Sequence, residues 1–193
     1  MKTRTLVALA FAAGLAGGLA LQPSPTQPTP VPIPVLDNQG PTLKEFVAQR
    51  QEAQRIMSNF SARAGIVRPI SLAVGACPVA CVDIGIGSAT AYVFIEEALL
   101  FRPRIVLEKV IAHEIGHVAA GHVYQWKGKR DEEKSEAQYE ADAYAMCLMG
   151  EARYREYLKV IDVDEEAIER HIVRLKAFDV RLPPQADAAK ALI

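Results

Sequence analysis

Residues 113–122 read HEIGHVAAGH and contain three of the four histidines of the chain. His113 and His117 are four positions apart, so in an α-helix their side chains lie on one face and can bind one metal ion. Glu114 lies next to His113 without being a ligand, where a carboxylate can act as general base toward a water that the metal activates. The stretch therefore predicts a helix that carries part of a catalytic zinc site.

The composition fits one domain with an apolar core. The chain has 193 residues, of which 50% are hydrophobic, and its formal net charge is −1. This length is sufficient for one domain that buries a substantial core. Because positive and negative charges almost balance, nothing in the composition indicates a surface for nucleic acid.

The first 20 residues have the pattern of a secretory signal peptide. Lys2 and Arg4 precede an apolar run from Leu6 to about Ala20, which is short for a membrane span and ends in small residues. We expect cleavage near Ala20, and no cysteine follows the run as a lipid attachment site. The alternative is an uncleaved membrane anchor, because short apolar runs fit both interpretations. In either case the rest of the chain is predicted to be secreted or periplasmic.

A proline-rich segment follows the signal peptide. Seven of the twelve prolines fall between Pro23 and Pro41, which indicates a stiff, extended linker rather than a packed element. The sequence thereby predicts four parts, namely a signal peptide (1–20), a linker (21–41), one catalytic domain (42–182) and a polar tail (183–193).

The three cysteines are consistent with an oxidising compartment. Cys77 and Cys81 are close enough to pair across Pro78, which leaves Cys147 unpaired. The alternative is three buried thiols, since free cysteine is a common small core residue. Two cysteines at this spacing without a second pair match no common structural zinc site.

The pattern from residue 42 onward indicates an α+β domain. Thr42 and Glu45 have the spacing of a capping box for a helix that ends near Gly65. Three β-branched segments come next, and we expect them to form a small, mostly antiparallel sheet: Ile66 to Val74, Val82 to Ile86 and Ala91 to Ile95. The sheet should pack on the helix that carries the histidine motif.

That helix begins after Pro103 and is apolar on most of its circumference, with Glu108 and Lys109 as the only charges before the motif. A helix that is apolar nearly all round is buried. Unpaired polar groups in a core cost roughly 2–7 kcal/mol each, and a metal ion satisfies the histidines and Glu114 together. Two more helices are predicted further along the chain: Ser135 to Leu158 and Asp164 to Phe178.

The motif supplies only two zinc ligands, whereas catalytic zinc normally takes three protein ligands and a water. His122 lies about 140° around the same helix from His117, which argues against His122 as the third ligand. In another zinc pattern a glycine turn brings a third histidine six residues on, and we expect that turn to be absent here. We therefore expect the third ligand from the carboxylate-rich segment 133–150.

HEIGHVAAGH followed by YEADAYA (139–145) resembles the gluzincin metallopeptidases. It is similar to the family of the CaaX prenyl-protein protease and the periplasmic quality-control proteases, and also to ImmA/IrrE-type metallopeptidases. The resemblance covers roughly residues 106–149. It implies a zincin-like catalytic domain in which the second helix carries E-x-x-A-D or E-x-x-A-N, with the Glu binding Zn²⁺. It also implies that an extended peptide pairs with a sheet edge, which we expect at Thr90 to Ile95.

The chain departs from the family pattern at the third ligand. Aligning Ala141 and Asp142 with the family's A-D puts Gln138 where a glutamate is expected. Gln138 can coordinate through its carbonyl oxygen as a neutral ligand, or a shift of the helix can bring Glu140 to the metal instead. Glu136 is the weaker substitute. A third possibility is a site that binds zinc poorly in a protein that has lost activity.

The resemblance gives Asp142 a role beside the metal rather than on it. We expect this carboxylate to hydrogen-bond the non-ligating nitrogen of a zinc histidine, which fixes the tautomer of that ring. The alternative is an ordinary aspartate on the helix surface. Gly116 has no side chain, and this would let the second helix or a substrate strand approach closely.

Together these observations predict a secreted or periplasmic zinc metallopeptidase. It would hydrolyse peptide bonds of a peptide or an unfolded protein, with Zn²⁺ as cofactor and Glu114 as general base. The other class of function is an inactive zincin-like pseudoprotease or peptide-binding module, and Gln138 is the residue that favours it.

Overall fold

The computed structural model describes residues 40–75, 79–83, 89–122 and 131–184. The expected signal peptide (1–20), almost all of the expected linker (21–41) and most of the polar tail (183–193) lie outside these ranges. Cys77 also lies outside them. Cys81 is disulfide-bonded, and Cys147 is a free thiol.

The first helix, α1 (Leu43–Arg63), confirms the predicted capping box. The Thr42 side chain accepts a hydrogen bond from the backbone of Glu45, and the Glu45 carboxylate accepts one from the Thr42 backbone at 2.8 Å. The inner face of α1 buries four apolar residues at helical spacing: Ala53, Ile56, Met57 and Phe60. This face joins α1 to the core of the domain.

The sheet has three strands in the order β1-β3-β2, where β1 is Ile70–Val74, β2 is Ala80–Asp83 and β3 is Ala91–Ile95. The predicted α+β class is confirmed. The expectation of a mostly antiparallel sheet is wrong for one of the two pairs, since β3 runs antiparallel to β2 but parallel to β1. The reason is that β3 inserts between the two earlier strands instead of following β2 at the edge.

Strand β3 is therefore the centre of the sheet, and the expectation that Thr90 to Ile95 forms a free edge is wrong. The inward side chains of β3 are all apolar and fully buried: Ala91, Val93 and Ile95. Within the described residues, the edges of the sheet are β1 and β2.

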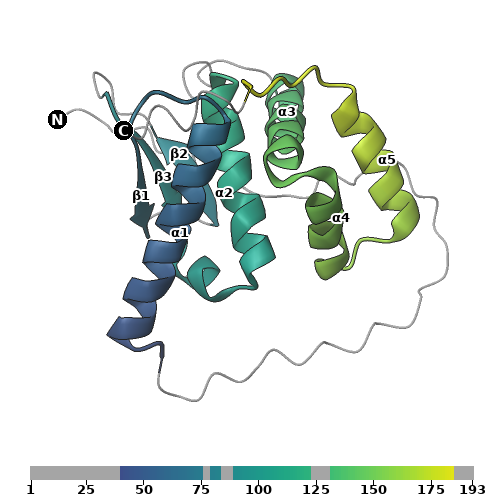
Figure 1. The fold of residues 1–193 in the computed structure, drawn as a ribbon. Coiled ribbons are helices and arrows are strands. Elements are labelled where there is room, and N and C mark those ends of the chain that lie inside the picture. Colours follow the sequence, from purple (N-terminus) through teal and green to yellow (C-terminus); the bar gives the residue numbers. More distant parts are fainter. Residues whose placement is uncertain (1–39, 76–78, 84–88, 123–130, 185–193) are drawn as a thin grey trace.

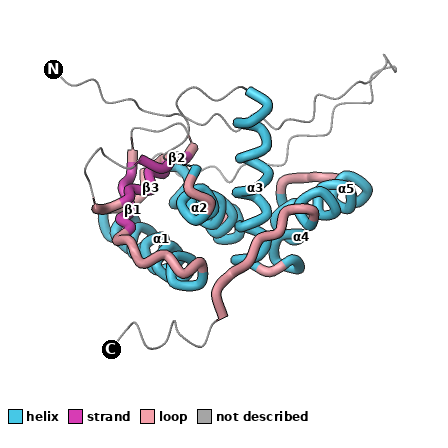
Figure 2. The backbone as a smooth tube through the Cα atoms, turned by 90° about the horizontal axis from the view of Figure 1, so that it is seen from above, coloured by secondary structure: helices cyan, strands magenta, loops and turns pink. Residues whose placement is uncertain are grey.

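Helix α2 (Arg104–Ala119) carries the histidine motif and forms the axis of the domain. A short 3₁₀ helix, η1 (Glu97–Phe101), leads into it from the sheet. Figure 2 shows α2 with α1 and the sheet on one side and α3 on the other. Eleven of its sixteen residues are buried, which confirms the prediction of a buried helix.

Three helices complete the fold, namely α3 (Asp131–Met149), α4 (Glu151–Val160) and α5 (Glu165–Lys176). The single helix expected from Ser135 to Leu158 is broken at Gly150, where a φ of +84° interrupts the helical path. Figure 1 shows α3 beside α2, with α4 and α5 on the far side from the sheet. Thus α2 and α3 pack directly against each other.

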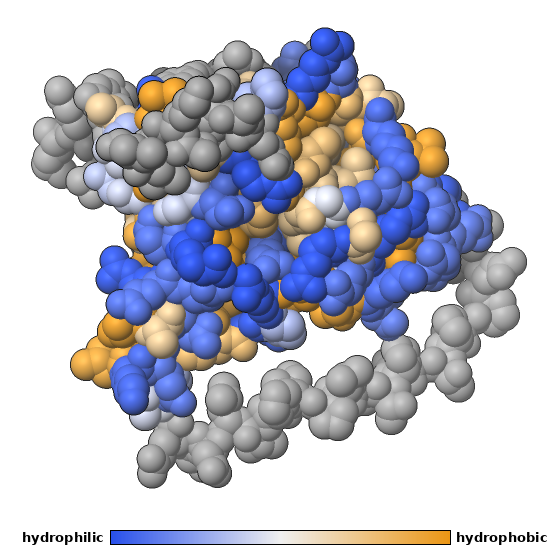
Figure 3. Space-filling view, viewed as in Figure 1, coloured by the Kyte–Doolittle hydropathy of each residue, from blue (hydrophilic) through white to orange (hydrophobic). Residues whose placement is uncertain are grey.

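The surface is mostly polar in the view of Figure 3, and hydrophobic residues show at the lower left and in the upper right part of the view. Leu43 and Val47, near the N-terminal end of α1, are exposed. Among the described helices, none has the length and apolar character that crossing a membrane requires.

Candidate metal centre

The polar residues of α2 form one row on the side that faces α3. Lys109, His113 and His117 are spaced four apart, and all three are buried in the domain. Gln138 and Asp142 of α3 have the same spacing and contact this row from the opposite side. Two helices thus bring five polar side chains into one buried layer.

Gly116 allows α3 to approach α2 this closely. A Cβ atom at Gly116 would lie 2.6 Å from the carbonyl oxygen of Ala141 and 2.9 Å from the Cβ of Tyr144. Real Cβ atoms do not make such contacts with backbone, so any side chain here forces the helices apart. Of the two roles considered for Gly116, the structure shows the approach of the second helix.

His113 is held from both sides of its ring. Its Nδ1 lies 2.6 Å from Oδ1 of Asp142, and its Nε2 lies 3.0 Å from Oε1 of Gln138. The Nε2 atoms of His113 and His117 are 3.1 Å apart, and Nε2 of Gln138 is 3.3 Å from that of His117. The two imidazoles and the amide therefore converge on one point.

Asp142 is shared between His113 and Lys109. The Lys109 ammonium lies 3.0 Å from the same Oδ1 atom and is only 2% exposed, whereas the Asp142 side chain is 16% exposed. Burial alone would raise the pKa of Asp142, but the charges of Lys109 and His113 together with their hydrogen bonds hold it well below its usual value. Asp142 is thus a carboxylate that accepts a hydrogen bond from Nδ1 of His113.

His122 lies on the other side of His117. Its Nδ1 is 2.9 Å from Nδ1 of His117, and its Nε2 is 3.0 Å from Oε2 of Glu140. The expectation of a continuous helix through His122 is wrong, because α2 ends at Ala119 and Gly121 adopts a φ of +73°. The expectation that no glycine turn follows the motif is wrong as well, because Gly121 takes the backbone out of the helical path. His122 thereby reaches the Nδ1 side of His117.

The structure distinguishes the three candidates for the third ligand by position. Gln138 lies at the Nε2 atoms of His113 and His117. Glu140 lies against His122. Glu136 is exposed and lines a surface cavity of about 200 Å³ together with His122, Glu133, Ala137 and Glu140.

The convergent atoms fit a cation. Because Nδ1 of His113 donates to Asp142, Nε2 of the neutral ring carries a lone pair, and this lone pair faces the Gln138 oxygen at 3.0 Å. A metal ion between these two acceptors would satisfy both lone pairs. Ligand atoms about 2.0–2.1 Å from a tetrahedral Zn²⁺ are about 3.3–3.4 Å apart, close to the separations observed. The donor set therefore fits Zn²⁺ held by His113, His117 and Gln138.

The third donor of this set is an amide. Within the described ranges, no three His, Cys, Asp or Glu side chains gather in a metal-binding arrangement. The two histidines are instead completed by the neutral oxygen of Gln138, which is a weaker ligand than a carboxylate. The fit of the site to zinc therefore depends on Gln138.

Glu114 is buried beside the two histidines. It is 1% exposed, and its Oε2 atom has no hydrogen-bond partner among the described residues. Burial raises the pKa of Glu114, while the charges of His113 and Lys109 oppose that shift. Burial likewise lowers the pKa of His117 well below its usual value, which favours the neutral imidazole that a metal requires.

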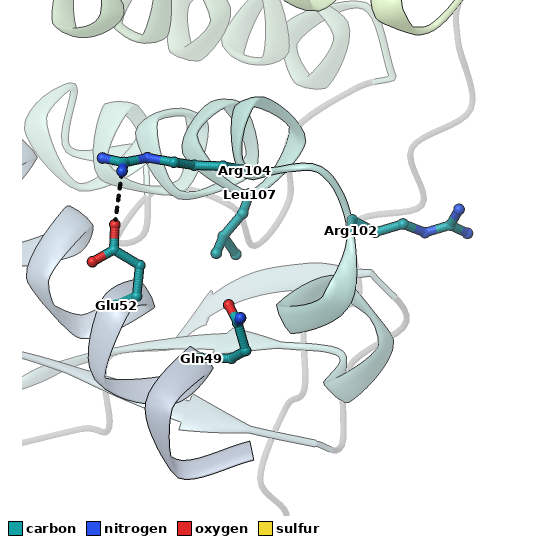
Figure 4. A pocket seen from close by; sticks show the side chains of 5 residues that line it. All are labelled: Gln49, Glu52, Arg102, Arg104 and Leu107. Carbon is teal, nitrogen blue, oxygen red and sulfur yellow. Dashed lines mark ion pairs between the residues drawn. The ribbon is translucent and has the colours of Figure 1, made fainter. Parts of the chain in front are cut away.

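A second cavity lies away from this centre. It has a volume of about 360 Å³ and is lined by Gln49, Glu52, Arg102, Arg104 and Leu107. In Figure 4, Arg104 faces Glu52, whose carboxylate is 3.4 Å away, while Arg102 points away from both. Arg104 begins α2, so this cavity is about 14 Å along the helix axis from His113.

The sequence analysis did not predict that Lys109 and His122 belong to the site. Lys109 is four positions before His113 and lies on the same face of an otherwise apolar helix. This position could have indicated that its ammonium is buried beside the histidines. His122 was set aside on the assumption of a continuous helix, although Gly121 directly before it was the signal for a turn.

Comparison of the chain with known protein families, with curated proteins and with solved structures finds no match. The resemblance to gluzincins thus depends on the motif residues and on the geometry described above.

Proposed function

We propose that the protein is a zinc-dependent metallopeptidase. The observation that carries the proposal is the convergence on Nε2 of His113, which lies 3.0 Å from Oε1 of Gln138 and 3.1 Å from Nε2 of His117. The buried carboxylate of Glu114 follows directly in the same helix. This combination of two imidazoles, a third oxygen donor and an adjacent buried carboxylate, whose Oε2 atom has no hydrogen-bond partner among the described residues, supports metal-assisted hydrolysis.

The chain's own residues have distinct roles in this reaction. Zn²⁺, when bound, supplies a Lewis acid that polarises a peptide carbonyl and lowers the pKa of water. His113, His117 and Gln138 hold it, and Asp142 keeps His113 oriented through Nδ1. Glu114 accepts a proton from the attacking water at its carboxylate and then delivers a proton to the nitrogen of the leaving amine.

The substrate is proposed to be an extended peptide or an unfolded protein. Such a chain can add to an exposed sheet edge through backbone hydrogen bonds. Strand β2 is the edge strand that contacts α2, so it replaces the segment Thr90 to Ile95 as the proposed binding edge. The disulfide at Cys81 in this strand supports a secreted or periplasmic location, because such bonds persist in oxidising compartments.

The proposal is tested by metal removal. Purified mature protein is incubated with an unstructured peptide pool or casein, with and without a chelator. We expect cleavage that the chelator abolishes and that one equivalent of Zn²⁺ restores. Cleavage that persists after complete metal removal would contradict the proposal, and so would a protein that fails to bind Zn²⁺.

Replacing the amide ligand with a carboxylate tests the role of Gln138. In Gln138→Glu, an anionic oxygen replaces a neutral one at the cation, and we expect zinc to bind about tenfold more tightly or better. Competition with a chromophoric chelator measures the dissociation constant. Glu136→Gln on the exposed face of α3 is the matched control and should leave it unchanged. Equal affinity of Gln138→Glu and wild type would show that Gln138 does not bind the metal.

The second candidate function is a peptide-binding pseudoprotease, and the neutral Gln138 favours it. In that case the mature protein would bind extended peptides without cleaving them, whether or not zinc is added. The cleavage assay with restored zinc separates the two functions.

A further inference from the structure

We propose that His122 and Glu140 form a positioning pair that fixes the tautomer and the ring orientation of His117. The inference rests on the proposed metal centre and names the part of the chain that prepares its second imidazole. His122 follows the end of α2, whereas Glu140 comes from α3. The three side chains form a continuous row from His117 to the surface, with separations of 2.9 and 3.0 Å.

The assignment of donors and acceptors along this row starts from the carboxylate of Glu140 at the surface. An ionised carboxylate only accepts hydrogen bonds, so the contact of 3.0 Å with Glu140 requires a proton on Nε2 of His122. In a neutral imidazole the other nitrogen, Nδ1, is then an acceptor. Nδ1 of His122 lies 2.9 Å from Nδ1 of His117, which must supply the proton of that bond.

His117 therefore carries its proton on Nδ1, and its Nε2 atom is left with a lone pair. That lone pair faces Nε2 of His113 at 3.1 Å, at the point where the proposed metal ligands converge. The pair of His122 and Glu140 thus selects the tautomer that can bind a cation. Without it, the proton of His117 is free to reside on Nε2 and to block that position.

The two histidines of the centre are held in different ways. His113 is oriented by Asp142, whose carboxylate also pairs with the buried ammonium of Lys109. His117 is oriented by an imidazole, and the carboxylate behind it is 38% exposed beside the cavity of about 200 Å³. Each imidazole is thus linked to a carboxylate of α3. His113 contacts Asp142 directly, and His117 is linked through His122 to Glu140 at the surface.

The glycine turn after α2 makes this arrangement possible. Because Gly121 has a φ of +73°, the backbone leaves the helical path after Ala119, and His122 lies against the Nδ1 side of His117. A histidine in a continuing helix would point away from His117.

The first test measures the tautomer in the metal-free wild-type protein. Long-range proton–nitrogen correlation spectra of ¹⁵N-histidine-labelled protein show which ring nitrogen carries the proton. We expect His117 to be protonated on Nδ1 and His122 on Nε2, and we expect His117 to become a mixture of tautomers in Glu140→Ala. A wild-type His117 protonated on Nε2 would overturn the proposal. This readout needs neither zinc nor activity, so it remains decisive if the proposed function fails.

The second test measures zinc affinity in variants of the pair. Loss of a group that orients a metal-binding histidine typically weakens metal binding by about 10- to 100-fold. We expect a loss of this size for His122→Phe and for Glu140→Ala. Glu140→Gln retains an acceptor oxygen for His122 and should recover most of the affinity.

Glu136→Gln is the matched control, because Glu136 lines the same cavity on the same helix. Glu140 is half-buried at the surface, so its variants are expected to fold even if His122→Phe does not. Zinc affinities of Glu140→Ala within about twofold of wild type would overturn the proposal. Equal losses in Glu140→Ala and Glu136→Gln would do the same, because they would indicate a general effect of surface charge.

Discussion

A Glu114→Gln variant is expected to lose peptide cleavage by about 10²- to 10⁴-fold, the usual contribution of a general base. The same variant should bind zinc as wild type does and be at least as stable. The reason is that Oε2 of Glu114 is buried without a hydrogen-bond partner among the described residues. Burying a carboxylate oxygen without a hydrogen-bond partner costs free energy of folding. The neutral amide of the variant should lower this cost while it removes the general base.

This combination of effects separates catalysis from structure. Cleavage is measured as kcat/KM on one peptide, stability by urea unfolding of the metal-free protein, and zinc affinity by competition. Glu97→Gln on the exposed part of η1 is the control and should change none of the three. If Glu114→Gln lowered stability and cleavage together, Glu114 would be a structural residue of the core. Cleavage that remained within a few-fold of wild type would exclude it as the base.

Lys109→Met is expected to destabilise the protein by about 3 kcal/mol. Removing one partner of a buried ion pair typically costs about 3–5 kcal/mol, because the remaining charge stays buried. We expect the lower end of that range, since Asp142 keeps its hydrogen bond to His113. Lys109 also lies 5.6 Å from the centre of the Tyr157 ring on α4. Its removal should therefore loosen the contacts of α2 with both α3 and α4.

Urea unfolding of the metal-free protein measures this effect, with Lys159→Met as the matched control. Lys159 pairs with Glu165 at 3.1 Å on the surface, where an ion pair contributes about 0–1 kcal/mol. The double variant Lys109→Met/Asp142→Asn removes both charges and should recover part of the loss. A Lys109→Met protein as stable as the Lys159→Met protein would show that the Asp142 carboxylate does not depend on Lys109.

Local patterns in the sequence predict much of this molecule. The capping box of Thr42 and Glu45, the burial of α2 and the close approach at Gly116 all follow from residue type and spacing. The positions of Gln138 and Asp142 were inferred from the resemblance of this segment to the gluzincin pattern, and in the structure both side chains contact the ring of His113. Such features depend on only one or two helices.

The features that the sequence does not predict depend on distant parts of the chain. No local signal states that β3 lies between β1 and β2, since strand order depends on the pairing of segments that are distant in the sequence. The position of His122 depends on where α2 ends, and the apolar pattern continues through Val118 and Ala119 without a break. Gly121 was the local signal for that end, and a prediction based on helical angle alone misses it.

We propose that one Zn²⁺ ion binds between α2 and α3 at His113, His117 and Gln138. Anomalous diffraction at the zinc absorption edge, from crystals of the protein with one equivalent of Zn²⁺, locates the ion. We predict one peak per chain, about 2.0–2.2 Å from Nε2 of both histidines and from Oε1 of Gln138. A crystal in which zinc avoids these three atoms, or one with Glu140 in place of Gln138 at the metal, would contradict the account.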